Sequence, residues 1–307
     1  MNWKISLIIV FLFWSCQDNK SSLSLIDDGS YLLEVETLQT VIDNPKIKLL
    51  DFRALDDYNN GHIPGALHIS RGDIEDKSYS YKGMMASKSQ MEQLLSELGI
   101  ETDDMMVIYD DKGMCESARF WWILQNYGHN RIKILHGGLQ DWQAAGGEVS
   151  NAVTDIVTSS FKFSEGSKRN YHINKEDVLI ALNSGAKIID TRTIDEFNGA
   201  QHKKGAKKAG RLPSSIHMDW ANCINYNGDK RLKTIDKLES IFKTLNIEKT
   251  DPIILYCHSG VRSAHTTFVM TQLLGFENVK NYDGSWTEWS HFDDLPFESD
   301  HISLIKE

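Results

Sequence analysis

The segment 253–262, IILYCHSGVR, holds the residues best suited to chemistry. Its apolar start, 253–256, is typical of a buried strand and leads directly to Cys257. A helical pattern follows, and Arg262 stands five positions after the cysteine. Because free N–H groups at a helix N-terminus favour nearby negative charge, these groups and the arginine would stabilise a thiolate. We therefore expect Cys257 to be a nucleophile that forms a covalent intermediate.

The loop between Cys257 and Arg262 consists of small or polar residues. They are His258, Ser259, Gly260 and Val261. We expect this loop and Arg262 to bind the substrate, because backbone N–H groups in a tight loop can cradle an anion. The alternative, that Cys257 is only a small core side chain, leaves the polar and glycine-bearing loop unexplained.

The sequence contains an internal duplication. Residues 49–53, LLDFR, recur as IIDTR at 188–192. Farther along, matches keep one constant offset of 147 residues, as these pairs show: Leu98 and Leu245, Tyr109 and Tyr256, Gly113 and Gly260, Gly137 and Gly284, Trp142 and Trp289. A constant register over this length is not expected by chance, so the chain consists of two copies of one unit. The second copy carries a lysine-rich insertion around 200–210.

The duplication allows the two copies to be compared at the candidate site. At the position of Cys257 the first copy has Asp110, and at the position of Arg262 it has Cys115. Only the second copy therefore keeps both groups. Beyond the N-terminal region the only other cysteine is Cys223, and no C-x-x-C pair occurs. We expect neither a disulfide framework nor a metal site.

Both copies alternate strand and helix patterns. Short apolar runs predict buried strands at 48–51, 106–109 and 132–135, and again at 187–190, 253–256 and 279–282. Helical patterns lie between them, such as the one at 87–98, with Ser87 or Ser89 as its N-cap and Gly99 as its stop. This alternation is typical of an α/β fold. We expect two tandem domains, each a mostly parallel sheet with helices on both faces.

The composition describes a folded, acidic protein. Its 307 residues are 41% hydrophobic and 25% charged, which suits two domains with cores of ordinary size. The net charge of −10 argues against a nucleic-acid partner, because phosphate backbones require basic surfaces.

The N-terminal residues indicate export. An apolar run from Ile5 to Trp14 is too short to cross a bilayer but suits a signal-peptide core. Ser15 and Cys16 follow, as in a bacterial lipoprotein signal, so we expect Cys16 to become the first mature residue and to carry the lipid. The alternatives are an uncleaved anchor and an ordinary signal peptide. We expect a protein of the bacterial cell envelope, held to a membrane by its lipid.

These observations divide the chain into five segments. They are a signal peptide at 1–15, a polar tether at 16–30, a catalytically silent first domain at 31–150, a linker at 151–170 and a catalytic second domain at 171–307.

Four features together resemble the two-domain rhodaneses, which are sulfurtransferases. They are the duplication, GHIPGA at 61–66, SARFWW at 117–122 and YCHSGVR at 256–262. The resemblance implies a double displacement in which Cys257 takes the outer sulfur of a small anionic donor as a persulfide. It then passes this sulfur to cyanide or a thiol. No metal or organic cofactor is implied, and the first copy is expected to be silent.

The resemblance also implies roles for residues outside the Cys257 loop. Arg119, in SARFWW, would face the cleft between the domains and contact the anionic end of the donor; the alternative is a structural salt bridge. Asp110 would order the cleft. His62, in GHIPGA, would tie down its own loop, and Arg211 takes its place in the second copy.

The loop leaves the donor open between thiosulfate and 3-mercaptopyruvate. Ser259, Gly260 and Val261 are similar to the second group, but Arg262 and a partly charged His258 would suit the anionic thiosulfate, which we favour. Phosphatases also use cysteine–arginine loops, but with five intervening residues, whereas this loop has four. A non-enzymatic sulfur-binding or redox-sensing lipoprotein, with Cys257 as its switch, is the alternative of another class.

Overall fold

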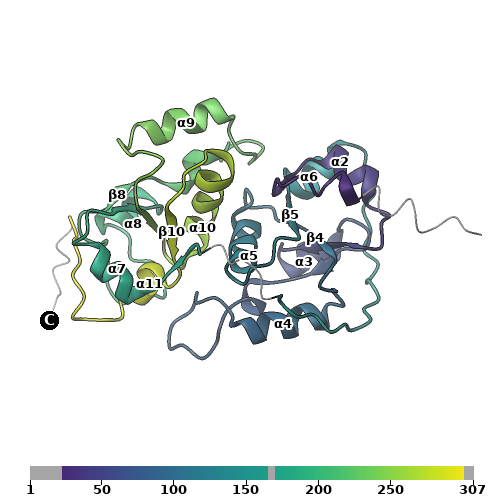
Figure 1. Cartoon of the computed structure of the whole chain (residues 1–307), viewed down its shortest axis with the longest axis horizontal. Coiled ribbons are helices and arrows are strands. Elements are labelled where there is room, and N and C mark those ends of the chain that lie inside the picture. Colours follow the sequence, from purple (N-terminus) through teal and green to yellow (C-terminus); the bar gives the residue numbers. More distant parts are fainter. Residues whose placement is uncertain (1–22, 165–169, 301–307) are drawn as a thin grey trace, which may run out of the picture.

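The computed structural model describes residues 23–164 and 170–300, which form two α/β units joined by a long connection (Figure 1). Each unit is built around a five-stranded sheet in which neighbouring strands run parallel. The tandem α/β fold is therefore as expected from the sequence. The expected signal peptide and Cys16 lie outside the described residues.

The first unit contains strands β1 (Leu32–Leu33), β2 (Ile47–Asp51), β3 (Leu67–His68), β4 (Met105–Tyr109) and β5 (Ile132–Leu135). Its helices are α2 (Val35–Val41), α3 (Leu55–Asn60), the short η1 (Arg71–Asp73), α4 (Lys88–Glu97), α5 (Cys115–Asn126) and α6 (Gly138–Ala144). The strand order is β1-β5-β4-β2-β3. Every residue of the central β4 is buried, as befits a parallel strand covered on both faces.

The second unit contains strands β6 (His172–Ile173), β7 (Lys187–Asp190), β8 (Ile216–His217), β9 (Ile253–Tyr256) and β10 (Val279–Tyr282). Its helices are α7 (Lys175–Ala181), α8 (Ile194–Asn198), the short η2 (Trp220–Cys223), α9 (Ile235–Lys243), α10 (Val261–Phe268), its continuation η3 (Val269–Leu273) and α11 (Ser285–Trp289). The order β6-β10-β9-β7-β8 repeats that of the first sheet. Tyr256 pairs with Asp190, so β9 and β7 end together, and Cys257 follows at this edge.

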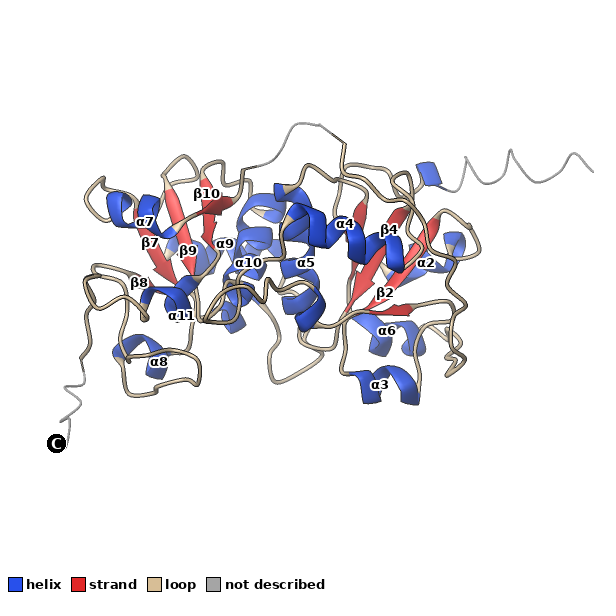
Figure 2. Ribbon diagram, turned by 90° about the horizontal axis from the view of Figure 1, so that it is seen from below, coloured by secondary structure: helices blue, strands red, loops and turns tan. Residues whose placement is uncertain are grey.

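Helices cover both faces of each sheet (Figure 2). In the first unit, α4 and α5 share one core with the strands, whereas α2, α3 and α6 share the core on the other face. In the second unit, α9 and η3 pack on one face, and α7 and α11 pack on the other. The doubly covered sheets fix the positions of the loops at the strand ends, where the candidate site lies.

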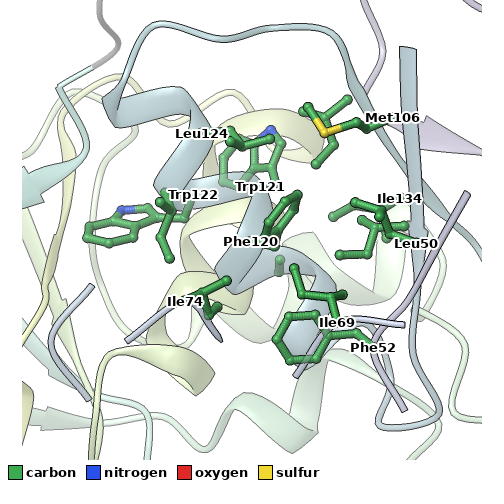
Figure 3. Packing of buried hydrophobic residues seen from close by; sticks show 14 of the residues in the cluster. Leu50, Phe52, Ile69, Ile74, Met106, Phe120, Trp121, Trp122, Leu124 and Ile134 are labelled. Carbon is green, nitrogen blue, oxygen red and sulfur yellow. The ribbon is translucent and has the colours of Figure 1, made fainter. Parts of the chain in front are cut away.

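Helices α5 and α10 lie side by side between the two sheets and join the units (Figures 1 and 2). Phe120 of α5 points toward Leu50 and Ile134 of the first sheet, whereas Trp122 lies on the other side of the helix (Figure 3). The ring of Trp121 meets the ring of Phe268 of α10 edge-on, with centroids 5.0 Å apart. The core of the first unit thus continues into the second.

The expected tether differs from the structure in its described part. Residues 23–30 pack on the first unit, where Ile26 is buried in the core and Lys133 donates to Asp28 at 2.6 Å. Two leucines and one isoleucine in a polar segment gave no periodic signal, so the sequence pattern missed this contact. The described part of the linker is also docked, because Phe161 and Phe163 enter the same core as α4 and α5.

Candidate active site

Cys257 occupies the loop between β9 and α10 and is 1% exposed. Three residues separate it from Val261, the first residue of α10. Gly260 caps the helix with φ of +72°, and a Cβ atom there would lie 2.4 Å from the carbonyl oxygen of Asp283. Only glycine satisfies both the left-handed backbone and this close approach. The strand end and the glycine therefore fix where the Cys257 sulfur lies.

The N-terminus of α11 holds this loop in place. The N–H groups of Cys257 and Gly260 donate to the hydroxyl of Ser285 at 3.1 and 3.0 Å. Trp286 N–H in turn donates to the carbonyl oxygen of Cys257 at 3.0 Å, and Thr287 donates to that of His258 through both its N–H and its hydroxyl. The loop is therefore held by hydrogen bonds along its whole length.

The electrostatic surroundings of Cys257 favour the thiolate. Burial alone would raise the pKa of this thiol, but the charge of Arg262, the hydroxyl and N–H of Ser263 and the N–H of Ser259 hold the pKa below its ordinary value. The other buried thiols differ. Burial raises the pKa of Cys223 to about 12, and burial with the nearby Glu116 carboxylate raises that of Cys115 well above its usual range. Among the described thiols, only that of Cys257 has a pKa below its ordinary value, which favours the nucleophilic thiolate.

Arg262 is oriented by Glu196 of α8. Its guanidinium donates to both carboxylate oxygens, at 2.6 and 2.9 Å. Burial would raise the pKa of Glu196, but its hydrogen bonds and charge pairing with Arg262 hold the pKa at about 2, so Glu196 is ionised. The sequence analysis missed Glu196. The sequence feature that could have pointed to Glu196 is the capping box that it forms with Thr193, which the structure shows at the start of α8.

A cavity of about 400 Å³ lies against the sulfur and draws its walls from both units. Its lining consists of Arg71, Lys112, Cys115, Glu116, Lys203, Trp220, Ile224, Tyr226, Lys230, Cys257, His258, Ser259, Val261 and Arg262. Five of these side chains are cationic and one is anionic. The anionic one, Glu116, is paired with Arg71 at 2.5 Å. The net positive lining in an acidic protein suits a small anionic ligand.

A strap of the second unit, residues 224–232, closes the cavity against the first unit. An antiparallel bridge joins its ends at Ile224 and Leu232. Lys230 donates to the carbonyl oxygen of Asp111 at 3.1 Å, and Arg231 forms ion pairs with Glu34, at 2.7 Å, and with Asp141. The site therefore depends on contacts between the two units.

Arg119 does not line the cavity, contrary to its expected contact with the donor. It is 1% exposed and pairs with Asp283 at 2.5 Å. The same guanidinium donates to the carbonyl oxygens of Gly83 at 2.9 Å and Gly260 at 3.4 Å, and it lies over the ring of Trp122. This geometry matches the alternative, a structural salt bridge. Arg119 connects the first unit to the back of the Cys257 loop.

His258 lines the cavity but lacks the positive character expected of it. Burial, followed by the nearby charge of Lys203, lowers the pKa of His258 to about 4. The imidazole is therefore neutral near pH 7, and its Nε2 lies 3.1 Å from the carbonyl oxygen of Lys204. The cations of the cavity are instead arginines and lysines, two of which, Arg71 and Lys112, come from the first unit.

The first unit fills its equivalent loop with its own carboxylate. Asp110 accepts N–H groups from Lys112 at 2.7 Å, Met114 at 3.1 Å and Ser117 at 2.8 Å, and also the hydroxyl of Ser117. Lys112 and Met114 correspond to Ser259 and Val261 at the offset of 147. The carboxylate thus takes up the N–H of Lys112, whose counterpart in the second unit, Ser259, interacts with the sulfur, and Asp110 orders its loop.

His62 and Arg211, which the sequence also predicted to be structural, lie outside the cavity and hold other loops in place. His62 is buried between the carbonyl oxygens of Tyr58, at 2.9 Å, and Ala152, at 3.1 Å, and so ties the GHIPGA loop to the linker. Arg211 pairs with Asp300 at 2.9 Å and with Glu298 at 3.3 Å, which anchors the last described residues rather than the cleft.

Residues 23–164 and 170–300 contain neither a cluster suited to a metal ion nor a helix suited to a membrane span. No group of three or more His, Cys, Asp and Glu side chains there could hold a metal ion. No helix in these ranges combines the length and apolar character needed to cross a bilayer.

Comparison with known proteins adds a family and named relatives. The rhodanese-like domain family matches the chain twice, at residues 34–145 and 174–292. The thiosulfate sulfurtransferase of Corynebacterium glutamicum is 31% identical over 250 residues, which cover 79% of this chain and 81% of that protein. The sulfur carrier protein TtuD of Thermus thermophilus is 29% identical over 279 residues, which cover 86% of this chain and 95% of that protein.

Among solved structures, SseA of Escherichia coli, a 3-mercaptopyruvate sulfotransferase, is similar with a TM-score of 0.71 and 28% identity. The match covers 84% of this chain and 99% of SseA. Tum1 of Saccharomyces cerevisiae has a TM-score of 0.78 at 21% identity, over 89% of this chain and 99% of Tum1, and so shares the fold.

Proposed function

The chain belongs to the rhodanese-like family and is a sulfurtransferase, and on that premise we propose that it moves sulfane sulfur from thiosulfate to cyanide or a thiol through a persulfide on Cys257. The observation that carries this proposal is a thiol with a lowered pKa, held by loop N–H groups at a cavity rich in cations. The relatives named as sulfurtransferases favour this activity over the phosphatase and the non-enzymatic alternatives.

The first half-reaction loads the enzyme. The Cys257 thiolate attacks the outer sulfur of thiosulfate, the sulfur–sulfur bond of the donor breaks, and sulfite leaves with the bonding electron pair. The enzyme then holds a persulfide anion. Arg262 and the loop N–H groups of Ser259 and Ser263 offset the charge of this anion, as they do that of the thiolate.

The second half-reaction unloads the enzyme. Cyanide attacks the outer sulfur of the persulfide, thiocyanate leaves, and the Cys257 thiolate is restored. A thiol acceptor reacts in the same way as its thiolate and leaves as a persulfide. Each step conserves charge and requires neither an oxidant nor a metal.

The lining of the cavity supports thiosulfate as the donor. Lys112 and Lys230 line the cavity together with Arg262. Such cations stabilise the dianion thiosulfate more than a singly charged carboxylate, because the electrostatic attraction grows with the charge. The alternative donor is 3-mercaptopyruvate, on which SseA acts according to its name. Its carboxylate would face the same cations.

The full chain, purified in detergent, tests the proposal. We expect thiosulfate to add about 32 Da, one sulfur, to the intact mass of the wild type but not of Cys257→Ala, because the nucleophile is then missing. Cys223→Ala is the matched control, since it removes a buried thiol that does not line the cavity and should load normally. Added cyanide should remove the extra mass and release thiocyanate.

The comparison of donors decides between the two candidates. Faster loading from 3-mercaptopyruvate would transfer the proposal to that donor. If neither compound loads the wild type, sulfur transfer by Cys257 is wrong.

We further propose that Cys16 carries a lipid and holds the protein to a membrane of a bacterial cell envelope. The support is the apolar run that ends in Ser15 and Cys16. In a bacterial host, we expect the wild type to incorporate labelled fatty acid and to partition into detergent, and Cys16→Ser to do neither. A wild type that carries no label, or a Cys16→Ser variant that still does, would contradict the lipid assignment.

A further inference from the structure

Ser285 has an unusual backbone for a residue with a Cβ atom. It begins α11, is fully buried and has φ of +51°. The left-handed region is unfavourable for such a residue, whereas glycine adopts it freely. Strained residues that persist near a reactive group often serve that group. Glycine at this position would avoid the strain but would lack the hydroxyl group of Ser285.

The hydroxyl of Ser285 uses its full hydrogen-bonding capacity. It donates to the carbonyl oxygen of Tyr282 at 2.7 Å, and it accepts the N–H groups of Cys257 at 3.1 Å and Gly260 at 3.0 Å. One donor and two acceptor positions are all that a hydroxyl has. Ser285 thus joins the end of β10 to both ends of the loop that carries the sulfur.

The first unit provides the comparison. Gly138 matches Ser285 at the offset of 147, begins α6 and has nearly the same backbone, with φ of +57°. A Cβ atom on Gly138 would lie 2.6 Å from the carbonyl oxygen of Asp110, and the Asp110 carboxylate orders that loop from within. Glycine is thus sufficient for the fold at this position, whereas the reactive copy has a serine.

The two bonds to Ser285 also determine which N–H groups remain for the sulfur. Those of Cys257 and Gly260 point to the hydroxyl, whereas those of Ser259 and Ser263 interact with Cys257 itself. A loop without the hydroxyl would have two buried N–H groups with no partner, and these would draw it into another conformation.

We propose that Ser285 is a positioning residue for sulfur transfer, and that its hydroxyl holds the Cys257 loop in the conformation that presents the sulfur to the cavity. The proposal rests on the sulfurtransferase function given above and adds a residue to it. Ser285 acts through the loop and does not line the cavity.

Two variants of the full chain test this role. Ser285→Gly removes the hydroxyl, relieves the backbone strain and reproduces the residue of the first unit; Ser285→Ala removes the hydroxyl and keeps the strain. We expect both to lose at least tenfold in the rate of sulfur loading. We also expect the pH profile for alkylation of Cys257 by iodoacetamide to move to higher pH, because the loop N–H groups no longer converge on the thiolate.

Ser290→Ala is the matched control. Ser290 is also buried and belongs to the turn that ends α11, where its hydroxyl accepts the N–H of Lys207 at 2.9 Å and does not contact the Cys257 loop. This variant should be destabilised without any change in the alkylation profile. A purely structural role for Ser285 would give the same result in its own variants.

The outcomes distinguish a failure of the positioning role from a failure of the proposed sulfur transfer. If the wild type loads sulfur and both Ser285 variants load at its rate with its alkylation profile, the inference is wrong and the function stands. If the wild type does not load but the variants shift the alkylation profile, the function is wrong and the positioning role stands. If Ser285→Ala does not fold, Ser285→Gly alone is sufficient for the test, because its backbone is less strained.

Discussion

Replacing Arg262 with alanine should slow sulfur loading by about 100-fold at pH 7, the scale of losing one group that stabilises charge in a reaction. Burial raises the pKa of Cys257, and the charge of Arg262 is the largest of the interactions that lower it. Without the arginine the thiol pKa rises, the thiolate fraction at pH 7 falls, and the persulfide loses its cation. Loading and iodoacetamide alkylation, each measured from pH 5 to 10, report the two effects.

The sign of the pH dependence distinguishes these effects. A raised thiol pKa predicts that alkylation of Arg262→Ala recovers at high pH, whereas loading recovers only in part because the cation is still missing. Arg262→Lys keeps a charge but cannot form the paired bonds to Glu196, so we expect an intermediate loss. His258→Gln is the control for titration: it should leave the midpoints of both pH profiles in place from pH 5 to 8, because the pKa of His258 is about 4. An unchanged alkylation profile in Arg262→Ala would contradict the assigned role.

Replacing Arg119 with methionine should lower the free energy of unfolding by about 3–5 kcal/mol, the range for removing one partner of a buried ion pair. Asp283 is 2% exposed, and within the described residues the N–H of Met85, at 3.0 Å, would be its remaining hydrogen-bond donor. The carbonyl oxygens of Gly83 and Gly260 would also lose a donor. Chemical denaturation of the full chain measures the change.

Two further variants show whether the loss comes from the unpaired charge. The double variant Arg119→Met with Asp283→Asn removes both charges and should recover part of the stability. Lys162→Met breaks a surface ion pair of ordinary length, 2.8 Å to Glu92, and should cost less than about 1 kcal/mol. A loss for Arg119→Met as small as that for Lys162→Met would show that the buried pair adds no stability.

The sequence was sufficient to predict the main strands. An apolar run of four or five residues between two helical patterns is too short for a helix and suits a buried strand. The predicted strands at 187–190, 253–256 and 279–282 match β7, β9 and β10, and Ser87 is the N-cap of α4. The four outer strands, β1, β3, β6 and β8, were missed. Each has two residues, which is too short for a periodic pattern, and each exists because it pairs with the neighbouring strand of its sheet.

The candidate site was predictable only at its reactive loop. The duplication indicated which copy keeps the cysteine, and local pattern placed Cys257 at a strand end. The partners of the arginines were not predictable, because Arg119 meets Asp283 across 164 positions and Arg262 meets Glu196 across 66. Such pairs arise from packing between distant segments, which a single sequence does not encode locally. The neutral state of His258 likewise follows from burial rather than from sequence.

The packing of α5 on α10 is an interface between two copies of one unit that share one chain. Two separate copies of the unit would have to associate through these helices, and the fraction of complete sites would then vary with protein concentration. Because the two units are joined covalently, the site is complete at any protein concentration. Once the partner is always present, it no longer needs a reactive cysteine. Asp110 can therefore close the loop of the first unit while that unit contributes cations and a wall to the second.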